Sequence, residues 1–254
     1  MSTPLKPLKW YRQLADKKGR LEAGAFLVEG DRAVRQVTGA NPAGVMEIIA
    51  TTEWPSVYAG HQVNHVTSRQ FQYISSTRTP QGIAAVVRLP GDIYSDRLPE
   101  DAGNRILLLE DIQDPGNTGT LIRTAAAFGF SGVIMTENGA DPLSPKCVQS
   151  TAGTVLSVWL RRTTGHSEMV KDLKTKGFIV VAADVRGDTG PEVIHYREKL
   201  LIVLGNEASG LSTALLDMAD YRLRIPTVQD KAESLNVAAC GAILMYLSAP
   251  EITG

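Results

Sequence analysis

Hydrophobic and polar positions change period repeatedly along the first 90 residues of the chain. Short apolar runs are separated by stretches with helical spacing and polar residues at their starts. We predict strands at residues 26–28, 45–50 and 82–87, and helices at residues 9–18, 32–37, 55–59 and 69–75. Asp31 and Ser68 are expected to cap two of these helices, because their side-chain oxygens can accept from the free N–H groups of a first turn. Strands that alternate with helices predict an α/β domain.

The same alternation recurs with stronger signals after residue 104. We predict strands at residues 105–109, 132–135, 178–183, 200–204 and 222–225, and helices through Arg123 to Gly129, over residues 171–176 and over residues 232–247. Continuous apolar runs are typical of strands buried on both faces, so we expect a mostly parallel sheet with helices on each side. The intervening stretch, residues 89–103, is rich in Pro, Gly and Asp, which is typical of a linker.

Composition adds one regional feature to this picture. The chain has 254 residues, of which 43% are hydrophobic and 21% charged, which fits a globular protein of one large or two ordinary domains. The formal net charge of -1 does not by itself indicate a nucleic-acid-binding protein. Basic residues nonetheless crowd the first segment, namely Lys6, Lys9, Arg12, Lys17, Lys18, Arg20, Arg32 and Arg35. On composition alone, this basic run fits a solvated helix face as well as an RNA contact.

Cysteine, histidine and hydropathy patterns argue against several other classes of protein. Cys147 and Cys240 lie far apart and form no CxxC pair, so we expect neither a zinc site nor a disulfide framework. His61 and His65 fit a surface position better than a metal site. The first residues lack the apolar run of a signal peptide, and no stretch approaches a membrane-spanning length, so we expect a cytoplasmic protein.

Unusual residues follow one predicted strand, at a place where parallel α/β sheets bind ligands. The loop from Asp114 to Arg123 reads D-P-G-N-T-G-T-L-I-R and leads into a helix whose free N–H groups can face an anion. Arg123 lies one helical turn past Gly119, so its guanidinium could reach a phosphate bound at the loop. Taken alone, however, a tight turn followed by a surface arginine explains this loop better.

Two further strand ends carry polar residues. The loop from Gly205 to Ser212, G-N-E-A-S-G-L-S, superficially resembles a phosphate loop, but Leu211 replaces the required lysine and excludes a nucleotide triphosphatase. Glu207 in this loop either accepts from a ligand or caps the next helix. After Ile225-Pro226, Ser234 and Asn236 open an otherwise apolar helix. Such polar groups are costly when buried without partners, so they either face a site or cap the helix.

The order and spacing of these three segments are more specific than any one of them. Together they resemble the three motifs of the SpoU (TrmH-like) family of SPOUT RNA 2′-O-ribose methyltransferases, over about residues 105–250. The front half is similar to the small ribosomal-protein-like RNA-binding domain that precedes the catalytic domain in many members. That similarity is carried by Arg20, Phe26, Val28, Glu29 and Gly30, and by the T-P-Q-G of residues 79–82. With this resemblance, RNA contact becomes the favoured interpretation of the basic run.

The resemblance implies a fold and a domain organisation. Residues 1–90 would form an α/β RNA substrate-binding domain, residues 91–104 a linker, and residues 105–254 an α/β SPOUT methyltransferase domain with a trefoil knot. Knots are rare exceptions to the usual topology rules, so the hydrophobic pattern does not predict this one. The resemblance also implies a homodimer formed through the knotted domain, without metal ions or membrane association.

The resemblance further implies a cofactor and a reaction. S-adenosylmethionine would be held largely by main-chain groups of Gly205, Ile225 and Leu235. The segment with Ser150, Thr151 and Gly153 would border the cofactor. The loop between Ile225 and Leu235 departs from the family pattern, since it is about one residue longer and lacks a glycine often found there.

The acceptor in this family is a ribose 2′-OH, a weak nucleophile that benefits from a base and from in-line positioning. The residue equivalent to Arg123 is the base proposed for the family. Because a guanidinium is effectively always protonated, an electrostatic role at phosphate and developing alkoxide is physically easier. The resemblance assigns Asn117, Glu207, Ser234 and Asn236 to positioning Arg123, the ribose or the cofactor.

Three alternatives stand beside this interpretation. A Rossmann-type methyltransferase or dehydrogenase requires a G-x-G-x-x-G-like loop, which the residues after the strand at 105–109 do not provide. A noncatalytic RNA-binding module of the same fold predicts degenerate motifs, whereas the motif residues are all present. Transfer RNA is the alternative substrate to large-subunit (23S) ribosomal RNA, which two-domain members more often modify.

Overall fold

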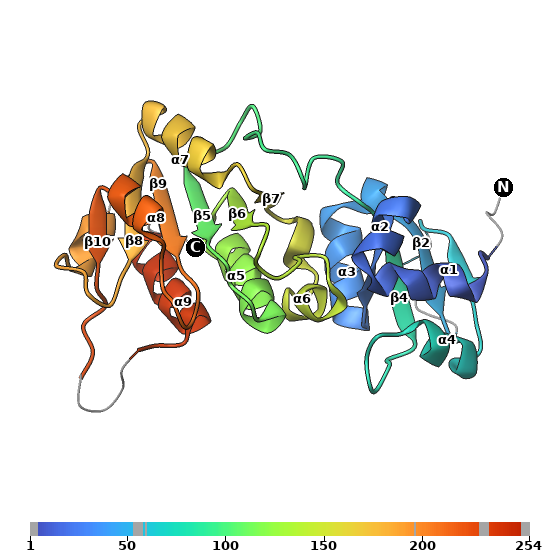
Figure 1. The fold of residues 1–254 in the computed structure, drawn as a ribbon. Coiled ribbons are helices and arrows are strands. Elements are labelled where there is room, and N and C mark those ends of the chain that lie inside the picture. Colours follow the sequence, from blue (N-terminus) through green and yellow to red (C-terminus); the bar gives the residue numbers. More distant parts are fainter. Residues whose placement is uncertain (1–4, 53–57, 59, 196, 229–233, 250–254) are drawn as a thin grey trace. The chain divides into compact units, whose positions relative to one another are not determined.

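The computed structural model describes residues 5–52, 58, 60–195, 197–228 and 234–249 (Figure 1). The chain forms two compact units. The first unit contains residues 1–91 and 141–157, and the second unit contains residues 92–140 and 158–254. Each unit has its own sheet.

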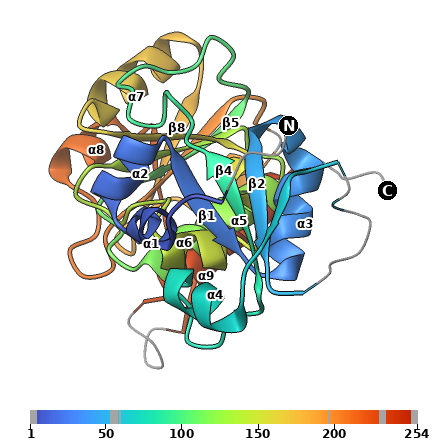
Figure 2. The ribbon, with the colours of Figure 1, turned by 90° about the vertical axis from the view of Figure 1, so that its right-hand side faces the viewer.

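The first unit is built on a four-stranded sheet with the order β1-β4-β2-β3 (Figure 2). Its strands are β1 (Ala25–Glu29), β2 (Val45–Ala50), β3 (Val63–His65) and β4 (Ile83–Arg88). β4 is antiparallel to β1 and β2, whereas β3 is parallel to β2. Three of these strands confirm the predicted ones, but the short β3 was not predicted because three residues carry too little periodicity.

Helices cover both faces of this sheet. They are α1 (Leu8–Arg12), α2 (Lys17–Ala23), α3 (Asp31–Ala40), α4 (Ser68–Ile74) and α6 (Pro145–Ser150). Tyr11 and Leu14 from the first helical segments and Phe71 and Ile74 from α4 form a core with the sheet. The alternate residues of the strands face the other way, where α3 packs on β1 and β4. This alternation explains why all positions of β4 before Arg88 are buried.

Several local predictions for the first unit are wrong in detail. The predicted helix 9–18 is broken by a 3-10 turn, Gln13–Ala15, and by extended backbone at Asp16, so that Gly19 packs directly against the Gln13 carbonyl. Gly30, not Asp31, occupies the cap position of α3, because its φ of 97° suits glycine. The predicted helix 55–59 lies outside the described residues except for Tyr58.

The cap of α4 is Thr67, not the predicted Ser68. The Thr67 hydroxyl accepts from the Gln70 N–H, and the Gln70 side chain accepts from the Thr67 N–H. This reciprocal pair satisfies two backbone donors at once, which a cap at Ser68 would not achieve.

The second unit contains a six-stranded sheet in which all neighbouring strands are parallel, with the order β10-β8-β9-β5-β6-β7. The strands are β5 (Arg105–Leu109), β6 (Gly132–Thr136), β7 (Trp159–Thr163), β8 (Ile179–Ala183), β9 (Leu200–Leu204) and β10 (Tyr221–Leu223). The mostly parallel sheet expected from the continuous apolar runs is therefore confirmed. β7 was not predicted because Arg161 and Arg162 interrupt its apolar pattern.

Helices cover both faces of the parallel sheet as well. On one face, α7 (His166–Thr175) and α8 (Thr213–Met218) pack on a core that includes Leu108, Leu201 and Val203. On the other face, α5 (Pro115–Ala127) packs against α9 (Val237–Ser248). Gly241 permits this close approach, because a Cβ there would collide with Leu121 of α5 and Leu204 of β9. The predicted start of the last helix at residue 232 lies outside the described residues, and α9 begins at Val237.

One segment does not follow the predicted domain boundaries. Residues 141–157 lie between β6 and β7 in the sequence, yet they pack with the first unit. The buried Arg20 guanidinium forms an ion pair of 2.6 Å with Asp141, and Gly153 lies against the backbone of Ala33 in α3. The segment includes the unpredicted helix α6. We therefore treat the ranges 1–90 and 105–254 as proposed domains rather than as compact units.

Candidate functional site

The site lies at the carboxyl ends of the strands in the second unit, where a parallel sheet opens toward ligands. After β5, Asp114 caps α5 by accepting from the Asn117 N–H at 2.8 Å, and Pro115 occupies the first helical position. The cap fixes Asn117 in the first turn of α5. The predicted helix N-terminus at this strand end is therefore present.

The loop after β9 is held in a tight hairpin. Asn206 and Gly210 exchange backbone hydrogen bonds of 3.1 and 3.0 Å, and the Asn206 side chain accepts from Ala208 and Ser209. Gly205 has no room for a side chain, because a Cβ would lie 2.5 Å from the carbonyl carbon of Gly210. The Asn206 amide also donates to the Asp111 carbonyl at 2.8 Å, which joins this loop to the end of β5.

A hydrogen-bonded network connects the three sequence motifs. The Asn117 amide donates to Glu207 Oε1 at 3.0 Å, and Asn117 Oδ1 accepts from the Asn236 amide at 3.2 Å. Asn236 also caps α9 by accepting from the N–H groups of Ala238 and Ala239. Asn117 thus bridges residues that lie 90 and 119 positions away in the sequence. The structure therefore brings together three of the polar residues predicted for the site.

Arg123 lies on α5, and its side chain is exposed. Its guanidinium makes no hydrogen bond or ion pair with any residue that the structure describes. Most buried or half-buried arginines of this unit are bonded, as Arg161 is to the Arg97 carbonyl and to Asp92. A charged group without a protein partner is available for an anionic ligand.

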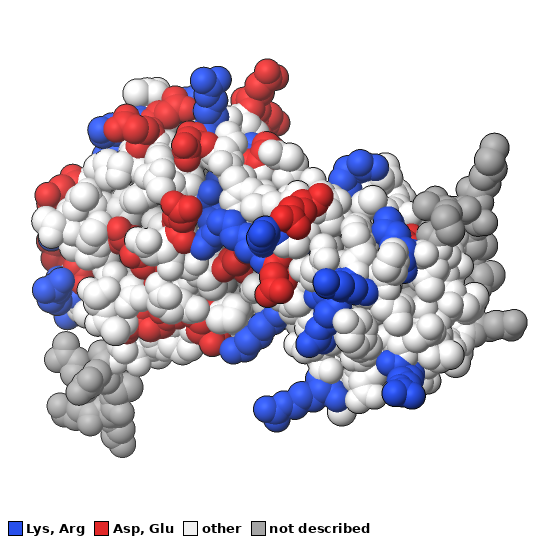
Figure 3. Space-filling model, turned by 45° about the vertical axis from the view of Figure 1, so that its right-hand side comes forward, with Lys and Arg blue, Asp and Glu red and all other residues white. Residues whose placement is uncertain are grey.

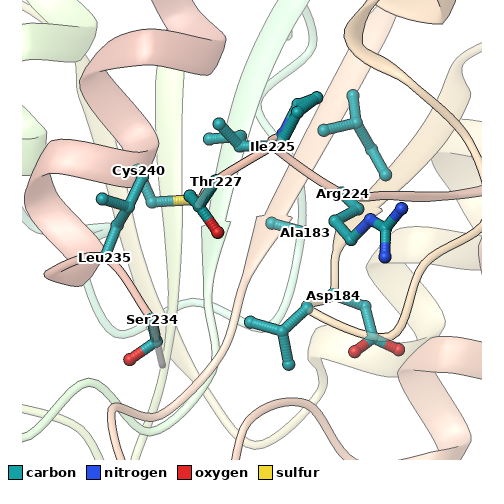
Figure 4. A pocket seen from close by; sticks show the side chains of 11 residues that line it. Ala183, Asp184, Arg224, Ile225, Thr227, Ser234, Leu235 and Cys240 are labelled. Atoms are coloured by element: carbon teal, nitrogen blue, oxygen red, sulfur yellow. The ribbon is translucent and has the colours of Figure 1, made fainter. Parts of the chain in front are cut away.

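Two adjoining cavities open beside this network, and Figure 4 shows the smaller one. The smaller cavity, of about 210 Å³, lies between the end of β8, the segment after β10 and the residues before α9. Figure 4 shows Ser234, Leu235 and Cys240 on one side of it and Ala183 and Asp184 on the other. The larger cavity, of about 630 Å³, extends along the loop from Gly205 to Leu211 and includes Glu207. Their shared walls make one continuous, partly apolar site with a few polar groups, as is usual for small-molecule ligands.

Main-chain groups at this site lack protein partners. Within the described residues, the backbone N–H and C=O groups of Gly205, Ile225 and Leu235 make no hydrogen bond. Backbone polar groups in a folded protein are nearly always paired with protein, water or ligand. These three residues are the ones for which the sequence predicted main-chain contacts with a cofactor, and all three line the cavities.

The remaining predicted site residues divide into two groups. Ser234 lines both cavities. Ser150, Thr151 and Gly153 belong to the segment that packs with the first unit and do not line either cavity. Their place beside a cofactor stays a prediction. The unusually long loop before Leu235 falls largely on residues 229–233, outside the described part of the chain.

Sequence reasoning missed several lining residues. Asp184 follows β8 directly, so the strand-end rule that found the other motifs could have found it. Arg224 and Thr227 lie just beyond β10, which ends at Leu223. The strand predicted there continues to residue 225, so the start of this loop was not recognised. Cys240 gave no sequence signal because it lies within an apolar helix. Burial raises the pKa of the Cys240 thiol to about 11, so the thiol is protonated near neutral pH.

The fold and the site define an α/β protein with a ligand cavity at the ends of parallel strands and a polar network beside it. Residues 104–246 match the SpoU rRNA Methylase family, and residues 6–85 match the MRM3-like substrate binding domain. The first match covers more than half of the chain. The protein therefore belongs to the SpoU rRNA Methylase family.

Individual relatives agree with this assignment over nearly the whole chain. The chain is 33% identical over 242 residues to the 23S rRNA (guanosine(2553)-2′-O)-methyltransferase RlmP of Bacillus subtilis, covering 94% of each protein. A crystal structure of an AdoMet-bound rRNA methyltransferase from Sinorhizobium meliloti has a TM-score of 0.80 and 28% identity, covering 98% of this chain and 96% of that one. The SpoU methyltransferase AviRb from Streptomyces viridochromogenes shares the fold, with a TM-score of 0.82 at 24% identity, over 96% of this chain and 97% of its own.

Proposed function

We propose that this protein transfers a methyl group from S-adenosylmethionine to a ribose 2′-OH of RNA, with 23S ribosomal RNA as the substrate. The observation that carries the proposal is the network in which Asn117 joins Glu207 and Asn236 beside a cavity with unpaired main-chain groups. The names of the Bacillus subtilis relative and of the 23S rRNA (uridine(2479)-2′-O)-methyltransferase of Streptomyces viridochromogenes, 28% identical over 94% of this chain, support the ribosomal substrate.

The residues present fit S-adenosylmethionine. Free N–H and C=O groups of Gly205, Ile225 and Leu235 would bind the polar edges of the cofactor, and the apolar wall around Ile225 and Leu235 would cover its base. The bound cofactor supplies an electrophilic methyl group on a sulfonium sulfur. The family resemblance alone assigns Ser150, Thr151 and Gly153 to its border.

The polar residues of the site would position and polarise the RNA. The ribose oxygen would accept the methyl group of the cofactor, which would leave as S-adenosylhomocysteine, and the proton of the ribose hydroxyl would pass to solvent water. Arg123, a permanent cation without a protein partner among the described residues, would hold an RNA phosphate and stabilise the developing negative charge on the oxygen. Glu207 is oriented by Asn117, and Asn117 by Asn236, so these residues and Ser234 would set the geometry of the attack.

We also propose that the protein is a cytoplasmic homodimer whose second unit is threaded into the family's trefoil knot. Apolar exposure on α9 supports the dimer, since Ile243 is 37% and Tyr246 is 67% exposed. Tyr246 also packs edge-on against Phe128. None of the helices in the described residues is long and apolar enough to cross a membrane.

The proposal is tested with purified protein, labelled S-adenosylmethionine and unmodified RNA transcripts. We expect methyl transfer to 23S ribosomal RNA in preference to transfer RNA. The Arg123→Lys variant should lose about 100- to 1,000-fold in turnover while its cofactor affinity stays within about twofold. Arg222→Lys, on a surface arginine paired with Asp217, is the matched control.

Three outcomes would overturn parts of the proposal. Near-full turnover by Arg123→Lys would remove Arg123 from the chemistry. Preferential transfer to transfer RNA would replace the proposed substrate. Absence of S-adenosylmethionine binding in calorimetry, even at millimolar concentration, would leave a noncatalytic RNA-binding module.

A further inference from the structure

Formal charge divides unevenly between the two units. The first unit contains twelve Lys and Arg residues against seven Asp and Glu, a net charge of +5. The second unit contains fourteen Lys and Arg against twenty Asp and Glu, a net charge of -6. The near-neutral total of the chain thus conceals a basic unit. Among the charged side chains seen over the first unit in Figure 3, most are blue.

Most acidic groups of the first unit are engaged within it, which leaves cations to dominate its surface. Glu47 accepts from Lys6 and the Tyr11 hydroxyl. Asp31 accepts from Arg35 and the Tyr58 hydroxyl. The Glu29 carboxylate accepts from the Ser75 hydroxyl and, at 2.9 Å, from the Ser76 N–H. These carboxylates are therefore poor partners for further surface cations.

The basic run at the start of the chain is also largely engaged in internal contacts. Lys6 pairs with Glu47, Arg20 with Asp141 and Arg35 with Asp31. The Arg12 guanidinium donates to the carbonyls of Tyr73 and Ser75. These four cations of the basic run therefore already have protein partners, whereas Arg32 of the same run makes no contact within the described residues.

Three exposed arginines of the first unit lie at the start of α3, on α4 and on the loop that follows α4. Arg32, Arg69 and Arg78 are exposed and make no hydrogen bond, ion pair or ring contact within the described residues. Arg69 and Tyr73 lie four residues apart on α4, so their side chains share one face of that helix. Tyr73 is 51% exposed, although the same helix buries Phe71 and Ile74.

The loop of residues 75–82 follows α4, carries Arg78 and is held by several hydrogen bonds. Glu29 binds its start through Ser75 and Ser76, and the Gln81 side chain accepts from the Asp31 N–H at 3.0 Å. These contacts tie the loop to the junction of β1 and α3, where Arg32 lies. Arg78 is therefore presented on a rigid loop, which reduces the entropy lost when it binds a partner.

We infer that Arg32, Arg69, Tyr73 and Arg78 form the surface on which the first unit binds single-stranded or looped RNA. The arginines bind phosphates, and the exposed ring of Tyr73 stacks on an unpaired base. This combination of free guanidinium groups with an exposed aromatic ring is the chemistry that recognises unpaired RNA. The inference deepens the proposed function and rests on it, because it names the part of the protein that holds the substrate.

The test compares four single variants, Arg32→Gln, Arg69→Gln, Tyr73→Ala and Arg78→Gln, with Arg88→Gln as the matched control. Arg88 is exposed and without a partner among the described residues in the same unit, but it lies at the end of β4 remote from the loop. Binding is measured with a 23S ribosomal RNA transcript and with poly(U), at several salt concentrations. Methyl transfer to the transcript and thermal unfolding are measured on the same preparations.

We expect each Arg→Gln variant of the surface to weaken RNA binding about fivefold and to lower the salt slope by about 0.7 to 1. Tyr73→Ala should weaken binding about tenfold and leave the salt slope unchanged, whereas Tyr73→Phe should retain most of the affinity. Each surface variant should raise KM for RNA while kcat at saturating RNA stays within about twofold. Arg88→Gln should match the wild type.

The outcomes separate this inference from the proposed function. If the wild type binds RNA and transfers methyl groups but the surface variants bind as Arg88→Gln does, the surface is wrong and the proposed function stands. If the wild type binds RNA and the surface variants bind more weakly but no methyl is transferred, the surface stands and the proposed function fails. If the wild type binds no RNA, both are overturned.

Discussion

The two units of this protein differ in how they use charged side chains. In the first unit, carboxylates are engaged by neighbouring donors, and free arginines remain at the surface. The second unit is acidic overall. Its candidate site is a hydrogen-bonded network of Asn117, Glu207 and Asn236 at one edge of the sheet. Net charge therefore says little about this protein as a whole. Under the proposed function, RNA affinity and chemistry would therefore be divided between the units.

An acidic catalytic unit repels RNA unless another part of the protein holds the RNA nearby. Lys and Arg contacts to phosphates supply most of the sequence-independent affinity in nucleic-acid complexes. The basic first unit can supply this attraction, and under the proposed function Arg123 would supply a local positive charge at the reacting ribose. Separate perturbation of the two units should therefore produce separate defects.

The largest effect is expected from breaking the buried ion pair of the first unit. Arg20 is 2% exposed and Asp141 14%, so Asp141→Ala leaves an almost fully buried guanidinium without its carboxylate partner. The first unit should lose about 3–5 kcal/mol of unfolding free energy, measured by chemical denaturation. Asp141→Asn, which keeps an acceptor for the Leu143 N–H, should lose less. Equal stability of Asp141→Ala and wild type would show that the pair does not hold residues 141–157 on this unit.

Gly205→Ala should damage the second unit without affecting RNA binding. Its new Cβ would lie 2.5 Å from the Gly210 carbonyl carbon, so the loop beside the larger cavity must shift. Overpacking of this kind costs about 1–3 kcal/mol, so cofactor affinity should fall roughly 10- to 100-fold in calorimetry. Gly39→Ala, in the first unit with open space around the added Cβ, is the control. Unchanged cofactor affinity in Gly205→Ala would place the cofactor elsewhere.

Asn117→Ala should reduce turnover about tenfold or more, because it removes a hydrogen bond to a charged carboxylate. Cofactor affinity and RNA affinity should both change little. Asn236→Ser retains a helix cap but removes the amide that donates to Asn117. The double variant should be no worse than Asn117→Ala alone, since both act through one network. Additive losses in steady-state kinetics would show that the two residues act independently.

The smallest effect is expected for chemical modification of the Cys240 thiol, which probes the cavities directly. Because burial raises the pKa of its thiol to about 11, alkylation by iodoacetamide should be slow at pH 8 and accelerate about tenfold per pH unit up to that pKa. S-adenosylhomocysteine should slow the reaction severalfold further, because Cys240 lines both cavities. The Cys240→Ala variant identifies the modified residue by mass spectrometry. An alkylation rate unaffected by the ligand would argue that these cavities do not bind it.

Much of the second unit could be predicted from the sequence, because buried parallel strands have continuous apolar runs that end at distinctive loops. Five of the six strands and the carboxyl-end motifs followed from that pattern, and only β7 did not. The hydrogen bonds of Asn117 could not be predicted, since its partners lie 90 and 119 residues away. Asp184, by contrast, could have been predicted as a lining residue, because it follows β8 in the same way as the recognised motifs follow their strands.

Predictions for the first unit were less complete for a physical reason. The cations that remain available at its surface are those that form no internal ion pair or hydrogen bond. Such tertiary contacts have no local signal in the sequence. Arg12 and Arg20 look alike in the sequence to Arg32, yet they bond to carbonyls or to the half-buried carboxylate of Asp141. Arg69 and Arg78 lie outside the basic run, so the charge pattern did not indicate them. Likewise, residues 141–157 pack with the first unit although they lie in the second half of the sequence.

The central claim is that the methyl group reaches a ribose 2′-OH, and alkaline hydrolysis of labelled RNA tests it most directly. A 2′-O-methyl group blocks attack of that oxygen on the neighbouring phosphate, so the bond that follows it resists alkali. After incubation with the wild-type protein and methyl-labelled S-adenosylmethionine, the label in 23S ribosomal RNA should appear in alkali-stable dinucleotides, and Arg123→Lys should give almost none. Recovery of the label in mononucleotides would show methylation of a base instead and would contradict the account.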